Sequence, residues 1–296
     1  MKRGILLLYA SIGVLSVVAA CDKCACNMSG PSGGISDLVY KNGMSLQYAS
    51  AYYKSNHMGK STDVFHTCLL AGNYYLNENL KFNAQIPYQL NTRNSEVGNS
   101  QNQGFGDARV MLHAILMKAR DLGKGYLAEA QVGLGFKLPT GKYLTDLHAS
   151  NLPENFNTGN GAFGINAQAS VAISKDQMGI YLGSYYLQYL KSKDDYHFGN
   201  QLSLSSLFFV IKEWSNGFAL TPQTGFSWEH SWNDRGVNGF QIENTGGWGL
   251  LWPIGLSIRK DALLLNLQYS IPLEQNYAGG DSQLRNKMAI DLHYFF

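Results

Sequence analysis

Large apolar residues alternate with polar residues along most of the chain. The stretch FNAQIPYQL (82–90) places its phenylalanine, alanine, isoleucine, tyrosine and leucine on one side, and asparagine, glutamine and proline on the other. The same period of two recurs in GINAQASVAIS (164–174) and ALLLNLQYSI (262–271). A period of two places alternate side chains on opposite faces of a β-strand. The pattern therefore predicts an all-β protein.

About twelve such strands can be read, although the alternation is weakest in two of them (64–76 and 179–190) and the count could differ by two. The predicted strands are 43–54, 64–76, 80–92, 105–118, 125–138, 162–174, 179–190, 197–212, 217–231, 244–258, 262–273 and 285–296. Their polar face carries mostly Asn, Gln, Ser and Gly with scattered charges. The outer face of a soluble sandwich would be solvated and rich in Lys and Glu, so this composition favours a hydrated lumen.

The connections between these strands alternate in length. The short ones lie near 76–79, 119–125, 174–179, 213–217 and 259–262, and the longer ones at 55–63, 93–104, 139–161, 191–196, 232–243 and 274–284. Outer-membrane barrels have short periplasmic turns and longer external loops. We therefore expect a transmembrane antiparallel up-and-down β-barrel with both termini on the periplasmic side.

The first twenty residues have the layout of a secretory signal peptide. Lys2 and Arg3 precede an apolar stretch that ends near Val18, which is too short for a dependable spanning helix. No later apolar run reaches the 18 residues that a spanning helix needs. We expect three parts: a signal peptide (1–20), a periplasmic segment (21–42) and an outer-membrane barrel (43–296).

The chain ends in MAIDLHYFF, an alternating strand that finishes on Phe296. In a closed barrel the last strand pairs with the first and leaves no edge. The ending also resembles the C-terminal recognition signal of outer-membrane proteins. We therefore expect the barrel-assembly machinery and outer-membrane lipid as partners, in the outer membrane of a Gram-negative bacterium.

Composition adds one exclusion. The net charge is +2 and charged residues make up only 15% of the chain, whereas Gly (32) and Tyr (18) are abundant. A nearly neutral chain has no strong electrostatic attraction for nucleic acid, so we expect no nucleic-acid partner.

The segment CDKCACNM concentrates soft donors at Cys21, Cys24, Cys26 and Met28. Thiolate and thioether ligands suit Cu(I) or Zn, which makes this a candidate metal site. The residues before Cys21 also resemble a lipoprotein box, so acylation of Cys21, a disulfide and an inert tail remain alternatives. Cys68 lies on a predicted strand, where we expect a small packed side chain.

Charged residues at inward positions are the candidate transport residues. They are Asp107, Arg109, His113, Glu129, Lys137, Glu229 and Arg259, accompanied by Arg93, Gln131 and Asp291. Such groups either line a water path or close the lumen as a network of salt bridges. Twelve strands lie between small filled barrels and open channels of 16–18 strands, so we expect a narrow or gated passage.

Catalysis is the least favoured function. Glu229, His230 and Ser231 are adjacent in sequence, and strand alternation sends Glu229 and His230 to opposite faces, where they cannot act as base and orienting acid. We expect no enzymatic activity.

GFGDARVMLHAIL followed by GLGFKLPTGKY resembles the outer-membrane transporter-like family named after a protein of the phenol meta-cleavage pathway, itself similar to fatty-acid and toluene channels. The resemblance covers residues 105–142, and the cysteine-rich start resembles that of Bacteroidetes-type barrels. It implies uptake of small, often hydrophobic compounds and carries over no binding residues. Asp107 and Lys137 point inward on neighbouring strands, so they could pair and hold the following loop at the pore mouth.

Together these features predict an outer-membrane channel or transporter for a small solute, with hydrophobic and metal-related solutes both as candidates. The alternative is a structural or interaction barrel with a filled lumen, whose periplasmic cysteine segment contacts a metal.

Overall fold

The computed structural model describes residues 41–56, 59–145, 147, 152–190, 196–236 and 238–296. Its strands are β1 (Gly43–Ser55), β2 (Ser61–Asn77), β3 (Leu80–Ser95), β4 (Gly98–Phe105), β5 (Arg109–Gly123), β6 (Tyr126–Lys137), β7 (Gly164–Lys175), β8 (Met178–Tyr189), β9 (Gln201–Val210), β10 (Lys212–Glu213), β11 (Phe218–Ser231), β12 (Gly247–Lys260), β13 (Leu263–Tyr277) and β14 (Ser282–Phe295). The described residues also form two short 3₁₀ turns, η4 (Glu154–Phe156) and η5 (Ala278–Gly280).

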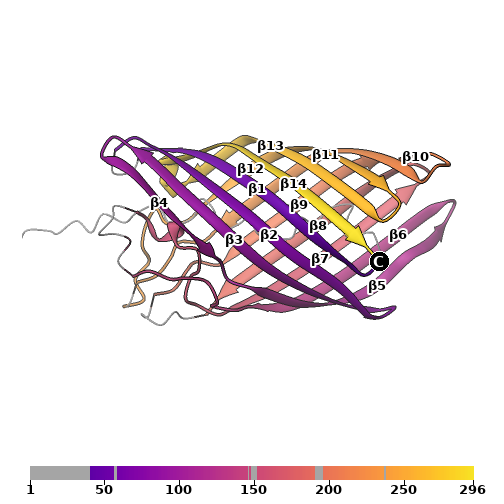
Figure 1. The fold of residues 1–296 in the computed structure, drawn as a ribbon, viewed down its shortest axis with the longest axis horizontal. Helices are drawn as coiled ribbons and strands as arrows, with labels where there is room; N and C mark the ends of the chain where they lie inside the picture. Colours follow the sequence, from indigo (N-terminus) through magenta and orange to yellow (C-terminus); the bar gives the residue numbers. More distant parts are fainter. Residues whose placement is uncertain (1–40, 57–58, 146, 148–151, 191–195, 237) are drawn as a thin grey trace, which may run out of the picture.

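These strands form a closed antiparallel barrel of twelve positions (Figure 1). β4 and β5 pair with successive parts of β3 and together fill one position. β9 and the short β10 both pair with β11 and fill another. β14 pairs with β1 from Gly43↔Phe295 to Ser55↔Ser282, which closes the ring. The predicted fold class and strand count are confirmed.

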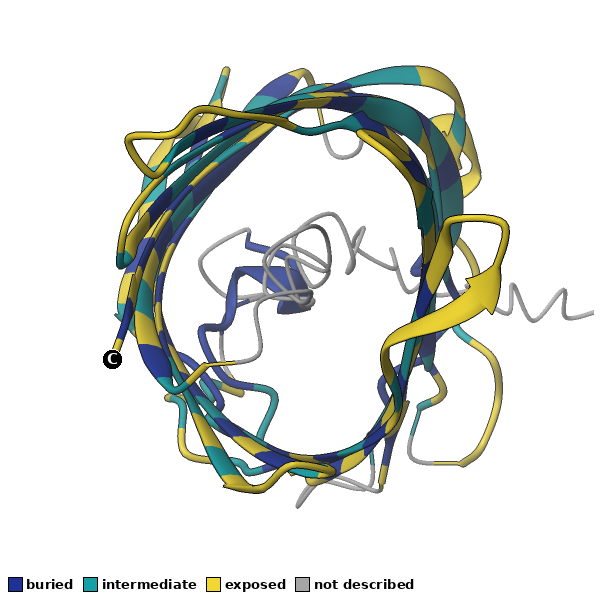
Figure 2. Ribbon diagram, turned by 90° about the vertical axis from the view of Figure 1, so that its right-hand side faces the viewer, coloured by how far each residue is buried: buried dark blue, intermediate teal, exposed yellow. Residues whose placement is uncertain are grey.

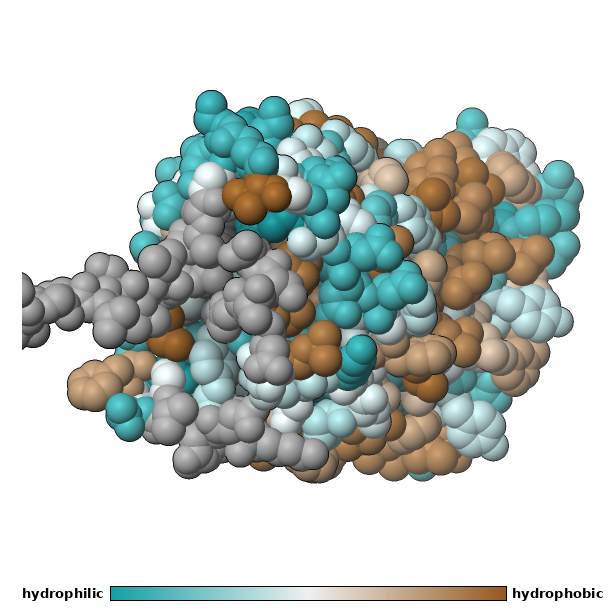
Figure 3. Space-filling model, turned by 60° about the vertical axis from the view of Figure 1, so that its left-hand side comes forward, coloured by the Kyte–Doolittle hydropathy of each residue, from teal (hydrophilic) through white to brown (hydrophobic). Residues whose placement is uncertain are grey.

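The outer surface of the barrel is apolar. On the last strand Ile290, Leu292 and Tyr294 are exposed, whereas Asp291 and His293 between them are buried on the lumen side. Hydrophobic residues dominate the barrel wall in Figure 3, and hydrophilic residues gather at the end that carries the loops. Cys68 lies on the outer face and is exposed, so the expectation of a packed side chain is wrong: alternation along β2 turns this position outward.

One end of the barrel, here called the turn end, carries the tight connections and both Gly43 and Phe295. Two-residue turns at 78–79, 124–125, 176–177 and 261–262 join the strands there. In three of these turns Lys124, Asp176 and Asp261 adopt positive φ values of 56°, 52° and 53°, which type I′ and II′ hairpin turns require at their first central position. The predicted short connections are therefore tight β-hairpins.

Two predicted loops at the opposite end, here called the loop end, are instead largely strand. Residues 93–104 form the tip of the β3–β4 hairpin, with Ser95 paired to Gly98, and the 274–284 connection shrinks to residues 278–281. Both stretches are rich in Asn, Gln, Ser and Gly. Their strands continue past the apolar band, where the outward face meets water, so no outward apolar row marks the strand in the sequence.

The connection between β6 and β7, residues 138–163, is here called the inner loop. Its η4 turn is buried, and Figure 2 shows a buried segment inside the ring of strands. Phe156, Leu147 and Leu152 join Tyr53, Phe65, Leu251 and Leu284 of the barrel wall in one apolar cluster. The described residues include no helix long and apolar enough to span a membrane.

Candidate functional site in the lumen

The predicted Asp107–Lys137 pair is confirmed. The Lys137 ammonium contacts the Asp107 carboxylate, and both side chains are only 3% exposed. Lys137 stands at the end of β6, and Asp107 lies in the break between β4 and β5. Removing one partner of such a buried pair leaves an uncompensated charge, which is strongly destabilising.

The same carboxylate holds both ends of the inner loop. Asp107 Oδ1 accepts a hydrogen bond from the Gly141 N–H, and Oδ2 accepts one from the Asn160 N–H, each at 2.9 Å. Lys137 Nζ also donates to the Ala162 carbonyl at 3.2 Å. One ion pair therefore fixes the points where the inner loop leaves and rejoins the barrel wall.

The tip of the inner loop is held by a second buried ion pair. Arg93 meets Asp63 with two hydrogen bonds of 2.8 and 2.9 Å, and its guanidinium lies over the Phe156 ring at 5.4 Å. Asn91 and Asn102 both donate to the Phe156 carbonyl, at 3.1 and 2.9 Å. Phe156 is thus hydrogen-bonded to β3 and β4.

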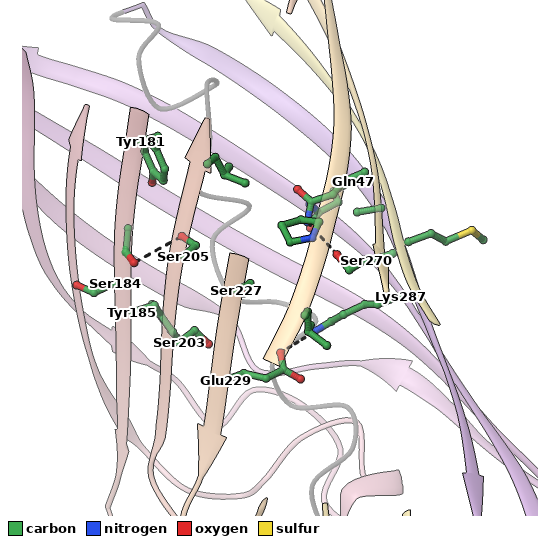
Figure 4. Close-up of a pocket in the computed structure, with 18 of the residues that line it drawn as sticks. Gln47, Tyr181, Ser184, Tyr185, Ser203, Ser205, Ser227, Glu229, Ser270 and Lys287 are labelled. Carbon is green, nitrogen blue, oxygen red and sulfur yellow. Dashed lines mark hydrogen bonds and ion pairs between the residues drawn. The ribbon is translucent and has the colours of Figure 1, made fainter. Parts of the chain in front are cut away.

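A polar cavity of about 160 Å³ lies beneath the inner loop. Ala49 and Leu251 belong both to its wall and to the apolar cluster around Phe156. The polar side chains that line it are Gln47, Gln168, Tyr181, Ser184, Tyr185, Ser203, Ser205, Ser227, Glu229, Gln268, Ser270 and Lys287. Figure 4 shows serines of β9 and β11 on one side of the cavity and Gln47, Ser270 and Lys287 on the other.

Glu229 connects these two sides. Its Oε2 accepts a hydrogen bond from Lys287 Nζ at 2.8 Å, and its Oε1 accepts one from the Tyr277 hydroxyl. The Tyr277 ring packs edge-on against Tyr53 at 5.9 Å, and Tyr53 packs against Phe65, which contacts Phe156. Side chains in van der Waals contact therefore run from the cavity to the tip of the inner loop.

The remaining predicted residues on β5 and β6 also point into the lumen, but each contacts a different neighbour and they do not form one site. Arg109 lies over the Tyr185 ring at 5.9 Å. His113 is 3% exposed and lies over Gly133, where an added Cβ would fall 2.6 Å from its Nδ1. Gln131 accepts a hydrogen bond from Lys81 at 2.9 Å. Glu129, whose Oε2 is buried, lies nearer the turn end of β6.

Arg259 lies at the rim and not within the lumen. It pairs with Glu213 at 2.6 Å, and its side chain is 41% exposed, because it lies one residue before the end of β12 at the turn end. Asp291 pairs with His293 at 2.7 Å on the lumen side. Glu229 is buried inside, whereas His230 packs outside between Trp228 and Trp232, as the alternation of β11 predicts.

The cavity itself was not predicted. Ser203, Ser205 and Ser227 have inward positions in QLSLSS and GFSWEH, but serine at an inward position occurs throughout the barrel. The grouping follows from the register between β9 and β11, which places Ser205 directly opposite Ser227 and Ser203 opposite Glu229. Cross-strand neighbours of this kind cannot be assigned from the period alone.

The predicted metal or acylation site at Cys21, Cys24, Cys26 and Met28 lies outside the described residues. Within the described ranges, no group of three or more His, Cys, Asp or Glu side chains is placed to hold a metal ion.

No profile of a protein family matches this sequence, and no curated protein matches it. Solved structures do. The chain is similar to an outer membrane channel from Pseudomonas putida F1, with 13% identity over 86% of this chain and 96% of that one and a TM-score of 0.62. It is also similar to the transport unit of the autotransporter AIDA-I from Escherichia coli (12% identity, 91% and 95% covered, TM-score 0.54). A third similar structure is the β domain of the Bordetella autotransporter BrkA (11% identity, 86% and 100% covered, TM-score 0.52). The chain therefore has the fold of the bacterial outer-membrane β-barrels.

Proposed function

We propose that the protein is an outer-membrane channel that passes small polar solutes through a lumen narrowed by the inner loop. The observation that carries this proposal is the polar cavity beneath the inner loop, inside a closed barrel with an apolar outer surface. A barrel that serves only as an anchor has no need for a cavity lined with hydroxyl and amide groups. The similar channel structure supports the fold on which this proposal depends.

The lining favours a polar solute over the hydrophobic compounds that the family resemblance implies. Polar side chains outnumber apolar ones around the cavity, and its charged groups, Glu229 and Lys287, neutralise each other. An apolar molecule entering this space would displace water from serine and glutamine groups without replacing their hydrogen bonds, which is unfavourable.

Conductance of the purified full chain in planar bilayers tests this proposal. We expect small single-channel currents that persist when Cys21, Cys24 and Cys26 are changed to serine, with and without Cu(I) or Zn. If the wild-type barrel carries no current but binds metal, and the three substitutions abolish that binding, the channel would be contradicted. This result would favour a periplasmic metal-contacting role for the N-terminal segment.

The second candidate is a structural barrel with a permanently closed lumen. It is favoured by the way the inner loop is fixed, through two buried ion pairs and the apolar cluster around Phe156. A barrel that stays silent in bilayers, and stays silent when the inner loop is released by substitution, would support this candidate.

A further inference from the structure

The cavity beneath the inner loop combines groups that recognise hydroxyl-rich molecules. Serine hydroxyls and glutamine amides both donate and accept hydrogen bonds. Ser203, Ser205 and Ser227 form a compact group because Ser205 and Ser227 are cross-strand partners on β9 and β11. Gln47 and Ser270 face them from β1 and β13 (Figure 4).

One buried group in this cavity lacks an internal partner. Gln47 is only 4% exposed and lines the cavity, and its Oε1 has no hydrogen-bond partner among the described residues. A buried acceptor without a partner costs free energy of folding. The oxygen is itself screened from the cavity, so a ligand hydroxyl would reach it after a rotation of the Gln47 side chain, and the hydrogen bond would then remove that cost.

The charges of the cavity argue for a neutral ligand. Among the described residues that line it, only Glu229 and Lys287 carry formal charges, and they pair at 2.8 Å. An anion or a cation would have to separate this pair or be buried without a counter-charge, and both are costly. A neutral hydroxyl can hydrogen-bond to the side of either charged group that faces away from the other, and this leaves the ion pair intact.

The size of the cavity limits the ligand. Its volume of about 160 Å³ is well below the roughly 300–1,000 Å³ of a pocket for a drug-sized ligand. The space therefore suits a single small ring or a short chain of hydroxylated carbons.

We propose that this cavity is a binding site for a small, neutral, polyhydroxylated solute of about the size of a monosaccharide. Gln47, Ser205 and Ser227 would hold the solute, together with the cavity-facing atoms of the Glu229–Lys287 pair. The inference rests on the proposed channel function, for which it names the solute class. The cavity shares Ala49 and Leu251 with the apolar cluster around Phe156, so a solute bound there would lie inside the barrel, close to the inner loop.

Equilibrium binding of D-glucose to the full chain tests the site independently of conductance. The protein is held in micelles of lauryldimethylamine oxide, which has no sugar headgroup, and a ligand-observed NMR titration gives the Kd. We expect saturable binding of glucose. Gluconate, an open-chain relative that carries a carboxylate, and the zwitterion glycine betaine should bind at least tenfold more weakly.

Matched serine variants locate the site. Ser205→Ala and Ser227→Ala should each raise the Kd for glucose about fivefold, the effect of losing one neutral hydrogen bond. Ser206→Ala is the control, because Ser206 is next to Ser205 on β9 but points to the outer surface, and its Kd should stay within twofold of wild type. Gln47→Leu should weaken binding at least as strongly as Ser205→Ala.

Absence of saturable glucose binding, tighter binding of gluconate or betaine, or an equal effect of Ser205→Ala and Ser206→Ala would overturn the site. Ion conductance without glucose binding would leave the channel standing and remove only the solute class. Glucose binding that depends on Ser205 and Ser227 in a barrel that does not conduct would retain the site and remove the channel.

Discussion

Asp107 and Lys137 pair across the β5–β6 wall, and the carboxylate of Asp107 also binds backbone N–H groups at both ends of the inner loop. This single side chain therefore joins the stability of the wall to the position of the loop. Few other polar groups in the described barrel connect so many separate segments.

Asp107→Asn should destabilise the barrel and loosen the inner loop. The substitution leaves the Lys137 ammonium buried without a counter-charge, a loss of about 3–5 kcal/mol for a buried pair. The measurements are urea-induced unfolding of the refolded barrel and single-channel current, which should increase. Asp121→Asn at an exposed turn is the control, since the Asp121 oxygen that accepts from Gly123 is retained as an amide oxygen. Unchanged stability and current in Asp107→Asn would show that the pair does not hold the loop.

Phe156→Ala should release the tip of the inner loop. The Phe156 ring is fully buried, contacts Phe65 at 5.0 Å and lies beneath Arg93, and truncation of a buried phenylalanine costs about 3–5 kcal/mol. We expect faster proteolysis within residues 138–163 and a larger conductance, with the barrel still folded. Phe105→Ala, on the outer face where the side chain is 64% exposed, should change neither. Equal protease resistance of the two variants would contradict a packed loop.

Gly249→Ala should disturb the Glu229 site. An added Cβ would overlap the Tyr277 hydroxyl, which donates to Glu229, so Tyr277 must move and the carboxylate loses a bond in a buried setting. We expect a loss of about 1–3 kcal/mol in unfolding free energy, measured by thermal denaturation. Gly72→Ala is the matched control, because only the Gly43 carbonyl comes within 4.0 Å of its new methyl; a change as large there would contradict the specific contact.

Cys68 should resist a charged maleimide when the protein is reconstituted into lipid vesicles. Its side chain lies on the apolar outer face, where acyl chains exclude a charged reagent because transfer of a charge into hydrocarbon is costly. The test uses a chain in which Cys21, Cys24 and Cys26 are serine, and mass spectrometry counts the label. Denaturation in urea is the positive control and should give one label per chain. Rapid labelling in intact vesicles would show that this face of β2 is not covered by lipid.

Much of the barrel could be predicted because a lipid-facing wall forces a strict period of two. Ile290, Leu292 and Tyr294 must face lipid whatever their neighbours are, so the pattern alone places them. The predictions failed where this constraint ends. The outer face of the β3–β4 hairpin meets water near its tip, so the exposed Asn94 and Gln101 look like loop residues although both are paired in strands.

The candidate site was predicted only in part, for a different physical reason. Asp107 and Lys137 lie at neighbouring strands and both occupy inward positions, and these two facts were enough to predict the pair. Glu229 and Lys287 lie on strands separated by β12 and β13, and their meeting depends on shear, on side-chain length and on the space left by Gly249. The path of the inner loop likewise depends on Phe156 finding an apolar surface made by strands remote in sequence.

The pairing of β1 with β14 also determines how the protein must be made. The first described strand begins at Gly43 and its neighbour β14 ends at Phe295, so the strands that close the barrel lie at opposite ends of the described chain. Contacts this remote form slowly, and until they form both edges stay open to wrong partners. Closure of the barrel is therefore a late step of folding, because one edge of β1 has no neighbour until β14 is in place.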